Sequence, residues 1–411
     1  MDQTLPQQGA PWAATRERMV EMAAGDVKWR EGKAAVYVFN AGEDVERVQK
    51  EAYALFAAEN GLGPAAFPSL ARMEREVVSN GLGLLHGPAG AAGAMTSGGT
   101  DSILMAVKAA RDFARKAHGV QGPLNIVLPR SAHPAFDKAC LVMEIEVRRT
   151  PLKDFLADPR AIEAAVDDAT IMIVGSAPCF PFGLIDPIEA LGALAERRDL
   201  WLHVDACVGG YIAPFVRMNG GDVPPFDFEV PGVRSISADL HKYGYCAKGA
   251  STVFFRSEDL KKYMIFEVGD WPAGKMITPT LAGTRPGGAI AAAWAVMQVL
   301  GVDGYRAKHG QVTRAREIIE AGVRDRGFTV IGAPQLGILA FTHPEVDGLA
   351  ILGKLYERGW VTSAISQPRG LHLMLSPVHL TVADRYLADL DWATEAARGQ
   401  TGAGEKVGYG R

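Results

Sequence analysis

From about residue 86 onward, short apolar runs alternate with stretches of helical periodicity, and this alternation limits the folds open to the chain. Repeated strand–helix alternation predicts an α/β fold with a mostly parallel sheet covered by helices. In such sheets, ligands bind at the carboxyl ends of the strands. Asp186 is expected to cap one helix, with Pro187 at its first position. The predicted strands are residues 124–129, 170–176, 200–206, 234–238 and 251–256, and the predicted helices among them are 101–117 and 187–198.

The 411 residues are enough for a large core and a second lobe. Residues 1–60 are expected to form an N-terminal segment, with helical spacing at 12–24 and 43–59 around an irregular arm. Residues 61–290 contain the strand–helix alternation and are expected to form the large domain. After residue 290, a long helix leads into a smaller α/β unit, so residues 291–411 are expected to form a C-terminal domain.

Composition excludes several classes of function. The formal net charge is -4, so a basic surface for nucleic acid or anionic membranes is not expected. The N-terminus lacks the pattern of a secretory signal. The longest weakly polar run, residues 287–302, is short for a membrane anchor and favours a buried helix. The four cysteines have neither zinc-site nor disulfide-framework spacing, which predicts reduced thiols in a cytoplasmic protein without a metal site. They are Cys140, Cys179, Cys207 and Cys246.

Lys242 is the first candidate for chemistry. It lies in SISADLHKYGYCAKG (235–249), just beyond a predicted strand and between His241 and Tyr243. Lysine is rarely buried without a partner, and a lysine delivered to a cleft by a strand is suited to imine chemistry. Taken alone, this segment is better explained by a solvated loop lysine.

Asp205 is the second candidate, because it ends the apolar run WLHVDAC (201–207), with His203 on the same strand face. A carboxylate at the mouth of a buried strand needs hydrogen bonds or a cation. A protonated pyridine nitrogen would serve, and the pairing would make that ring a stronger electron sink. An aspartate that caps the next turn is about as consistent with the pattern.

The segment TSGGTDS (96–102) opens a predicted helix. Gly98 and Gly99 let the backbone approach an anion, and the helix start supplies free N–H groups beside the hydroxyl of Thr100. This arrangement suits a phosphate monoester, although glycine-rich helix starts are common. His133 follows another predicted strand and is placed to lie on an aromatic cofactor, but a lone loop histidine is more often only a satisfied polar residue.

The order of these features is more specific than any one of them. A glycine-rich helix start, a histidine, a strand-end aspartate and a lysine about 37 residues later form the order of the pyridoxal 5′-phosphate (PLP) enzymes of fold type I. The chain resembles the group II PLP decarboxylase superfamily and, within it, the sphingosine-1-phosphate lyases. The resemblance covers roughly residues 26–290 and rests on segments such as DVKWREGK (26–33), MTSGGTDSILMAVKAARD (95–112), HVDACVGGYIAPF (203–215), SADLHKYGY (237–245) and LAGTRPGG (281–288).

The resemblance implies a role for each matching residue. Lys242 would carry PLP as a Schiff base, Asp205 would pair with the pyridine nitrogen, and His133 would stack on the ring. Tyr243 is a candidate base, as are Tyr37 and the freed Lys242. Tyr37, Asn60 and Lys248 would bind substrate, the first and last through its phosphate. The remaining residues that would bind cofactor are Gly98, Gly99, Thr100, His203, Ser237, His241, Gly283 and Thr284.

The implied reaction is retro-aldol cleavage of a small-molecule substrate, a phosphorylated 2-amino-3-hydroxy compound such as sphingosine 1-phosphate, to an aldehyde and phosphoethanolamine. Gly283 and Thr284 would reach the phosphate of PLP from a partner subunit, so a homodimer with shared sites is expected. The lyases carry a histidine where this chain has Gly63, which leaves amino-acid decarboxylation as the alternative reaction. A non-catalytic PLP-binding protein is the alternative of a different class.

Overall fold

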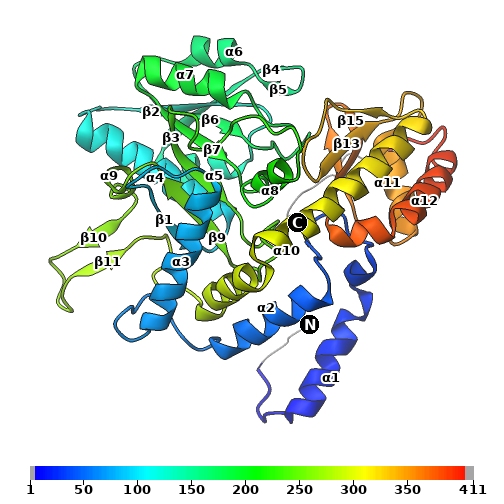
Figure 1. The fold of residues 1–411 in the computed structure, drawn as a ribbon, viewed down its shortest axis with the longest axis horizontal. Coiled ribbons are helices and arrows are strands. Elements are labelled where there is room, and N and C mark those ends of the chain that lie inside the picture. Colours follow the sequence, from blue (N-terminus) through cyan, green and yellow to red (C-terminus); the bar gives the residue numbers. More distant parts are fainter. Residues whose placement is uncertain (1–4, 403–411) are drawn as a thin grey trace.

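A computed structural model describes residues 5–402 and is built around a seven-stranded sheet of order β1-β9-β8-β7-β6-β2-β3 (Figure 1). The five strands from β8 to β3 are parallel, and β9 runs antiparallel to both of its neighbours. The carboxyl ends of β1, β7 and β8 therefore meet at one edge. The strands are β1 (Ala92–Thr96), β2 (Leu124–Pro129), β3 (Ile145–Thr150), β6 (Thr170–Ser176), β7 (Trp201–Asp205), β8 (Val233–Ala238) and β9 (Ser251–Phe255).

Helices cover both faces of this sheet because successive strand residues point to opposite sides. Ile126 and Leu128 belong to the cluster under α4 and α5, whereas Val127 belongs to the main core with α7 and α8. Both sides of each central strand are thus buried, as the apolar runs in the sequence predicted. These helices are α4 (Gly99–Ala117), α5 (Ala135–Met143), α6 (Pro159–Ala165), α7 (Ile188–Arg198), α8 (Ala213–Met218) and α9 (Glu258–Lys261).

A second sheet lies in the C-terminal lobe, with four antiparallel strands in the order β12-β13-β15-β14. Helix α10 (Gly287–Asp325) links the lobes and bends at Gly301, whose backbone is not helical. The expected domain boundary at 290/291 falls inside α10, near its start. The other elements of the lobe are β12 (Thr329–Val330), β13 (Ile338–Thr342), α11 (Gly348–Glu357), β14 (Ser363–Ser366), β15 (Arg369–Met374), η3 (Pro377–Thr381) and α12 (Ala383–Ala396).

The N-terminal arm is fastened to the C-terminal lobe rather than to the large sheet. The backbone of Ala35 bonds to that of Val361 and accepts from Met374. Lys33 is only 5% exposed. Its Nζ lies 3.2 Å from Asp389 Oδ2 and 4.0 Å above the Trp360 ring. The arm comprises α1 (Trp12–Met22), η1 (Ala23–Gly25), η2 (Trp29–Glu31) and α2 (Glu43–Leu55), and the following helix α3 (Pro68–Leu84) packs on β1 and β9 of the large sheet.

Two hairpins lie outside both sheets: β4 (Leu152–Lys153) with β5 (Leu156–Ala157), and β10 (Phe266–Val268) with β11 (Met276–Thr278). The expectation that Asp186 caps a helix is wrong. Its buried carboxylate accepts from the backbone N–H groups of Ala157 and Ser176, at 2.8 and 2.7 Å. Asp186 therefore ties the first hairpin to the end of β6.

Helix α10 contains the weakly polar run that the sequence analysis assigned to a buried helix. Among the described residues, α10 alone is long and apolar enough to cross a membrane. Core helices of soluble proteins pass the same test, and half of its most apolar window is buried inside the protein. In Figure 1, α10 runs between α2, α8 and the C-terminal sheet.

Candidate active site

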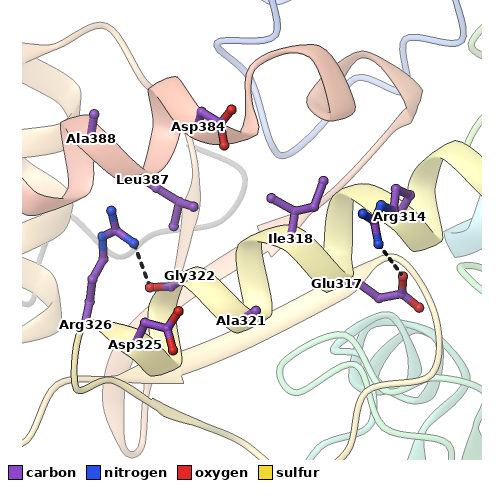
Figure 2. A pocket seen from close by; sticks show the side chains of 10 residues that line it. All are labelled: Arg314, Glu317, Ile318, Ala321, Gly322, Asp325, Arg326, Asp384, Leu387 and Ala388. Atoms are coloured by element: carbon purple, nitrogen blue, oxygen red, sulfur yellow. Dashed lines mark hydrogen bonds and ion pairs between the residues drawn. The ribbon is translucent and has the colours of Figure 1, made fainter.

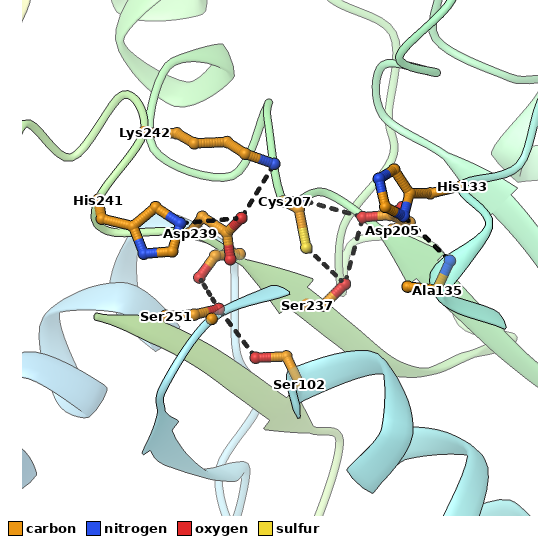
Figure 3. Close-up of polar contacts among 12 residues, drawn as sticks. Ser102, His133, Ala135, Asp205, Cys207, Ser237, Asp239, His241, Lys242 and Ser251 are labelled. Atoms are coloured by element: carbon orange, nitrogen blue, oxygen red, sulfur yellow. Dashed lines mark hydrogen bonds and ion pairs between the residues drawn. The ribbon is translucent and has the colours of Figure 1, made fainter. Parts of the chain in front are cut away.

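Three segments meet at the carboxyl edge of the large sheet, as Figure 3 shows. Strand β7 ends at Asp205, β8 leads into the turn with Asp239 and Lys242, and β1 leads into the glycine turn before α4. The shared edge follows from the strand directions, so residues far apart in sequence converge without any local signal.

Lys242 forms an ion pair with Asp239, whose carboxylate Oδ2 lies 2.9 Å from Nζ. The Asp239 side chain is only 2% exposed. Burial alone would lower the pKa of Lys242, but the carboxylates of Asp239 and Asp205 outweigh that effect and raise the pKa. The sequence analysis did not single out Asp239. The sequence did contain a signal for Asp239, because this aspartate lies three residues before a lysine that needs a partner if it is buried.

Asp205 is buried, and its carboxylate is oriented from two sides. Its Oδ1 accepts from the Cys207 backbone N–H at 3.1 Å and from the Ser237 hydroxyl at 3.4 Å. Within residues 5–402, no cation lies within ion-pair distance of Asp205. A buried carboxylate of this kind offers a ready partner for a protonated ring nitrogen.

His203 lies beneath the site rather than in it. Its ring nitrogens pair with the hydroxyls of Ser235 and Ser237, at 2.7 and 3.2 Å. Burial lowers the pKa of His203 to about 4, so the ring is neutral near pH 7. His203 and Ser237 are completely buried. His203 thus holds Ser237, and Ser237 in turn holds Asp205. A direct contact of His203 with the cofactor stays a prediction.

His133 lies beside Asp205 in Figure 3. Its Nδ1 accepts from the Ala135 backbone N–H at 3.1 Å, so the ring proton is on Nε2. Burial lowers the pKa of His133, although the charge of Asp205 opposes that effect. A neutral, oriented imidazole next to the carboxylate is suited to contact a flat aromatic ring.

The glycine turn before α4 packs closely on the Lys242 segment. A Cβ on Gly99 would lie 2.8 Å from Cys207 Sγ and 2.9 Å from Asp239 Oδ2, so no larger residue fits there. A Cβ on Gly98 would lie 3.6 Å from the His241 ring. Helix α4 has no side-chain cap at its N-terminus, and Thr100 is exposed there. The free N–H groups at this helix start are suited to bind a phosphate.

These residues fit PLP. An amine, a buried carboxylate that no cation of the described residues pairs with, and a helix N-terminus match the aldehyde, the ring nitrogen and the phosphate of that molecule. The Nδ1 atom of His241 is buried without a hydrogen-bond partner in the described structure, next to the glycine turn. Such an orphaned polar atom in a site of this kind is accounted for by a bound ligand.

Lys248 and Tyr37 lie together at the rim of the site. Lys248 Nζ donates to the carbonyls of Tyr37, at 2.8 Å, and His241, at 3.1 Å. Although Lys248 is exposed at its surface, the protein packed around Nζ and the charge of Lys242 lower its pKa to about 8. A cavity of about 270 Å³ adjoins them, lined by Trp29, Val38, Phe39, Asn40, Ala41, Gly42, Glu46, Gln49, His241, Cys246 and Lys248.

Two groups of expected site residues, Tyr243 and the Asn60–Thr284 pair, make their hydrogen bonds away from Lys242. Tyr243 is completely buried, and its hydroxyl donates to the Leu375 carbonyl at 2.7 Å, so it faces the C-terminal lobe. Burial also raises its pKa, which disfavours the phenolate form that a base would need. Asn60 holds Thr284 through a 3.3 Å hydrogen bond and accepts from the Arg285 N–H, next to Gly283.

A separate groove of about 550 Å³ lies between α10 and α12, far along the chain from the residues above (Figure 2). Its charged side chains are largely paired with one another or with backbone. Arg326 donates to the Gly322 carbonyl, and Arg314 pairs with Glu317. None of the expected site residues lines it.

Replacing Asp239 by Asn should lower the pKa of Lys242 in the cofactor-free protein. The carboxylate charge that opposes the effect of burial on this pKa is lost. Each unit by which the pKa of Lys242 falls raises the fraction of neutral amine about tenfold. The rate of reductive methylation of Lys242 near pH 8, followed by mass spectrometry, should therefore rise. Asp259→Asn removes an exposed aspartate paired with Lys262 and is the control. An unchanged Lys242 rate in Asp239→Asn would contradict the assigned pair.

Comparison with known proteins agrees with this site. The family described as pyridoxal-dependent decarboxylase conserved domain matches residues 1–343. A sphingosine-1-phosphate lyase of Oryza sativa subsp. japonica is 41% identical over 93% of this chain and 72% of its own length. A probable L-tyrosine/L-aspartate decarboxylase of Methanocella arvoryzae is 38% identical over 83% of this chain and 88% of its own length. The structure of a sphingosine-1-phosphate lyase of Burkholderia pseudomallei has a TM-score of 0.92 and 37% identity, covering 96% of this chain and 93% of that chain. The chain belongs to the pyridoxal-dependent decarboxylase family and is a PLP-dependent lyase.

Proposed function

We propose that the protein cleaves the Cα–Cβ bond of a phosphorylated 2-amino-3-hydroxy compound of the sphingosine 1-phosphate type. The products are an aldehyde and phosphoethanolamine. The observation that carries this proposal is the pair of lysines that share one site, with Lys242 neutralised by Asp239 and Lys248 left without a carboxylate partner among the described residues. The similarity to sphingosine-1-phosphate lyases over most of the chain supports it.

The cofactor, when bound, supplies an electron sink for the negative charge that develops at Cα. In the proposal, Lys242 Nζ attaches the cofactor, and Asp205 keeps its ring nitrogen protonated. His133 contacts the ring, and the glycine turn with Thr100 and His241 binds its phosphate. Each residue therefore holds one end or one face of the same molecule.

Proton transfer is assigned to Lys242. The Tyr243 hydroxyl is held by the Leu375 carbonyl, whereas Lys242 Nζ is the amine at the centre of the site. We propose that Lys242 Nζ, once the substrate amine has displaced it from the cofactor, takes the proton of the β-hydroxyl as the Cα–Cβ bond breaks and then returns that proton to Cα. The broken bond leaves an aldehyde on one side and an amine on the other. Positioned acid–base groups of this kind typically increase the reaction rate by a factor of roughly 10² to 10⁴.

Amino-acid decarboxylation remains the second candidate function. The decarboxylase relative from Methanocella arvoryzae, which is 38% identical, supports it. The two reactions differ in the bond broken at Cα, so they differ in product: an aldehyde from the lyase, carbon dioxide from the decarboxylase. A non-catalytic PLP-binding protein would release neither.

The Lys242→Ala variant should lose all turnover and the visible absorbance of protein-bound PLP, because no other amine replaces Nζ. The assay supplies sphingosine 1-phosphate and measures aldehyde, then supplies tyrosine, aspartate and glutamate and measures carbon dioxide. Aldehyde from the wild-type protein supports the proposal. Carbon dioxide without aldehyde would replace it by the decarboxylase, and turnover by Lys242→Ala would overturn the site.

The KM for phosphorylated substrate should rise as the pH passes above about 8. The pKa of Lys248 is lowered to about 8, so its charge, which is present below that pH, is lost above it. Lys248→Met should raise KM at pH 7 more for sphingosine 1-phosphate than for the unphosphorylated amino alcohol, and should flatten the pH dependence. Equal changes for both substrates would remove Lys248 from phosphate binding.

We also propose that the protein is a cytoplasmic homodimer with shared active sites. Four buried, unpaired cysteines are consistent with a reducing compartment. Helix α1 buries none of its residues, and the β10–β11 hairpin exposes Phe266 and Ile277, so both have apolar surface for a second copy to cover.

Shared sites predict complementation between two inactive variants. Lys242→Ala and Gly283→Trp, unfolded together and refolded as a mixture, should recover about a quarter of wild-type activity, because half of the dimers are mixed and each has one intact site. Each variant refolded alone should stay inactive. No recovery in a mixture that light scattering shows to be dimeric would place Gly283 and Lys242 in the same subunit's site.

A further inference from the structure

The turn that carries Lys242 has a strained backbone. Tyr245 has a φ of 54°, in the left-handed region that bulky residues rarely adopt. Its neighbour Gly244 has no room for a side chain, since a Cβ there would lie 2.5 Å from the Leu240 carbonyl oxygen. Strained conformations of this kind persist where the surrounding structure over-determines them, and they cluster at functional sites.

Helix α10 holds this turn through two polar contacts. The Tyr305 hydroxyl donates to the Gly244 carbonyl at 2.9 Å. The Tyr245 hydroxyl pairs with His309 Nδ1 at 3.1 Å. The two α10 residues are four apart, so they face the turn together. All four residues are buried, so a polar group that loses its hydrogen-bond partner here would be left unsatisfied at a cost in stability.

Further contacts fix the same turn from other sides. The Tyr245 ring stacks on His309, with centroids 5.2 Å apart at 26°. Gln49 of α2 donates to the Tyr245 carbonyl, and Tyr243 donates to Leu375 of the C-terminal lobe. Burial raises the pKa values of Tyr245 and Tyr305, so both keep their hydroxyl protons. Burial also lowers the pKa of His309 to about 3, so its ring is neutral and these contacts do not change with pH near neutrality.

We propose that Tyr305 and His309 are positioning residues, which hold the strained turn at Tyr245 and thereby keep Lys242 Nζ against Asp239. Neither touches the reacting atoms. They act through the turn, because the Tyr245 N–H donates to the Lys242 carbonyl at 3.0 Å. A shift of the Tyr245 backbone would therefore shift Lys242 as well. The inference rests on the proposed role of Lys242 as the residue that attaches the cofactor.

Tyr305→Phe and Tyr245→Phe test the proposal, because each removes one hydroxyl and leaves the ring in place. Tyr386→Phe is the matched control. Tyr386 is also a buried tyrosine, packed on Trp360 in the C-terminal lobe, and its hydroxyl has no hydrogen-bond partner in the described structure. Thermal unfolding of each cofactor-free variant shows whether it is folded.

The first readout is the rate of reductive methylation of Lys242 in the cofactor-free protein near pH 8. If the turn relaxes, Nζ leaves Asp239 and the rate rises in the same direction as in Asp239→Asn. The second readout is the dissociation constant of PLP, which should rise roughly three- to tenfold for the loss of one buried hydrogen bond. The control should change neither quantity.

Wild-type labelling rates and PLP affinity in both variants would overturn the proposal. That result would leave the proposed function intact if Lys242→Ala still abolished turnover. Conversely, turnover by Lys242→Ala would overturn the proposed function, whatever the labelling rates are. Should one variant fail to fold, the other still decides, since the two hydroxyls bond to different groups of the same turn.

Discussion

The ion pair between Lys242 and Asp239 is the interaction on which the rest of the site depends. Burying an amine is unfavourable unless a charge compensates it, and Asp239 provides that charge from a position that is itself buried. The neighbouring groups are arranged around the pair. Gly99 has no side chain because Asp239 and Cys207 fill the space. Lys248 is kept at the rim, where it adds positive charge that no carboxylate within residues 5–402 pairs with.

The parallel sheet brings these groups together by geometry. Strands β7 and β8 end at the same edge, and β1 reaches that edge because it is antiparallel to β9. Below the edge, side chains form a chain of hydrogen bonds that runs from His203 through Ser237 to Asp205. This arrangement leaves the carboxylate in place and its remaining oxygen available to a cation.

Both lobes and the N-terminal arm contribute to the position of the active lysine. Lys33 fastens the arm to Asp389 and Trp360, four residues before Tyr37, whose carbonyl accepts from Lys248. Tyr243 reaches Leu375 in the C-terminal lobe, and α10 holds the same turn from the other side. A change in how the lobes pack would therefore alter the site, even though no residue of the C-terminal sheet is assigned to the chemistry.

The sequence by itself determined the α/β fold, because strand periodicity is a local signal. The order of Gly99, His133, Asp205 and Lys242 along the chain predicted which residues would lie at the carboxyl edge of the sheet. Predicted strands 124–129 and 170–176 coincide with β2 and β6. Only the tertiary structure decided the partners. Asp186 looked like a helix cap, yet it bonds to the backbone of Ala157 and Ser176, and Tyr243 looked like a base, yet it faces Leu375. Spacing along the chain records which residues are available, whereas a hydrogen bond or an ion pair depends on which of them the packing brings within reach.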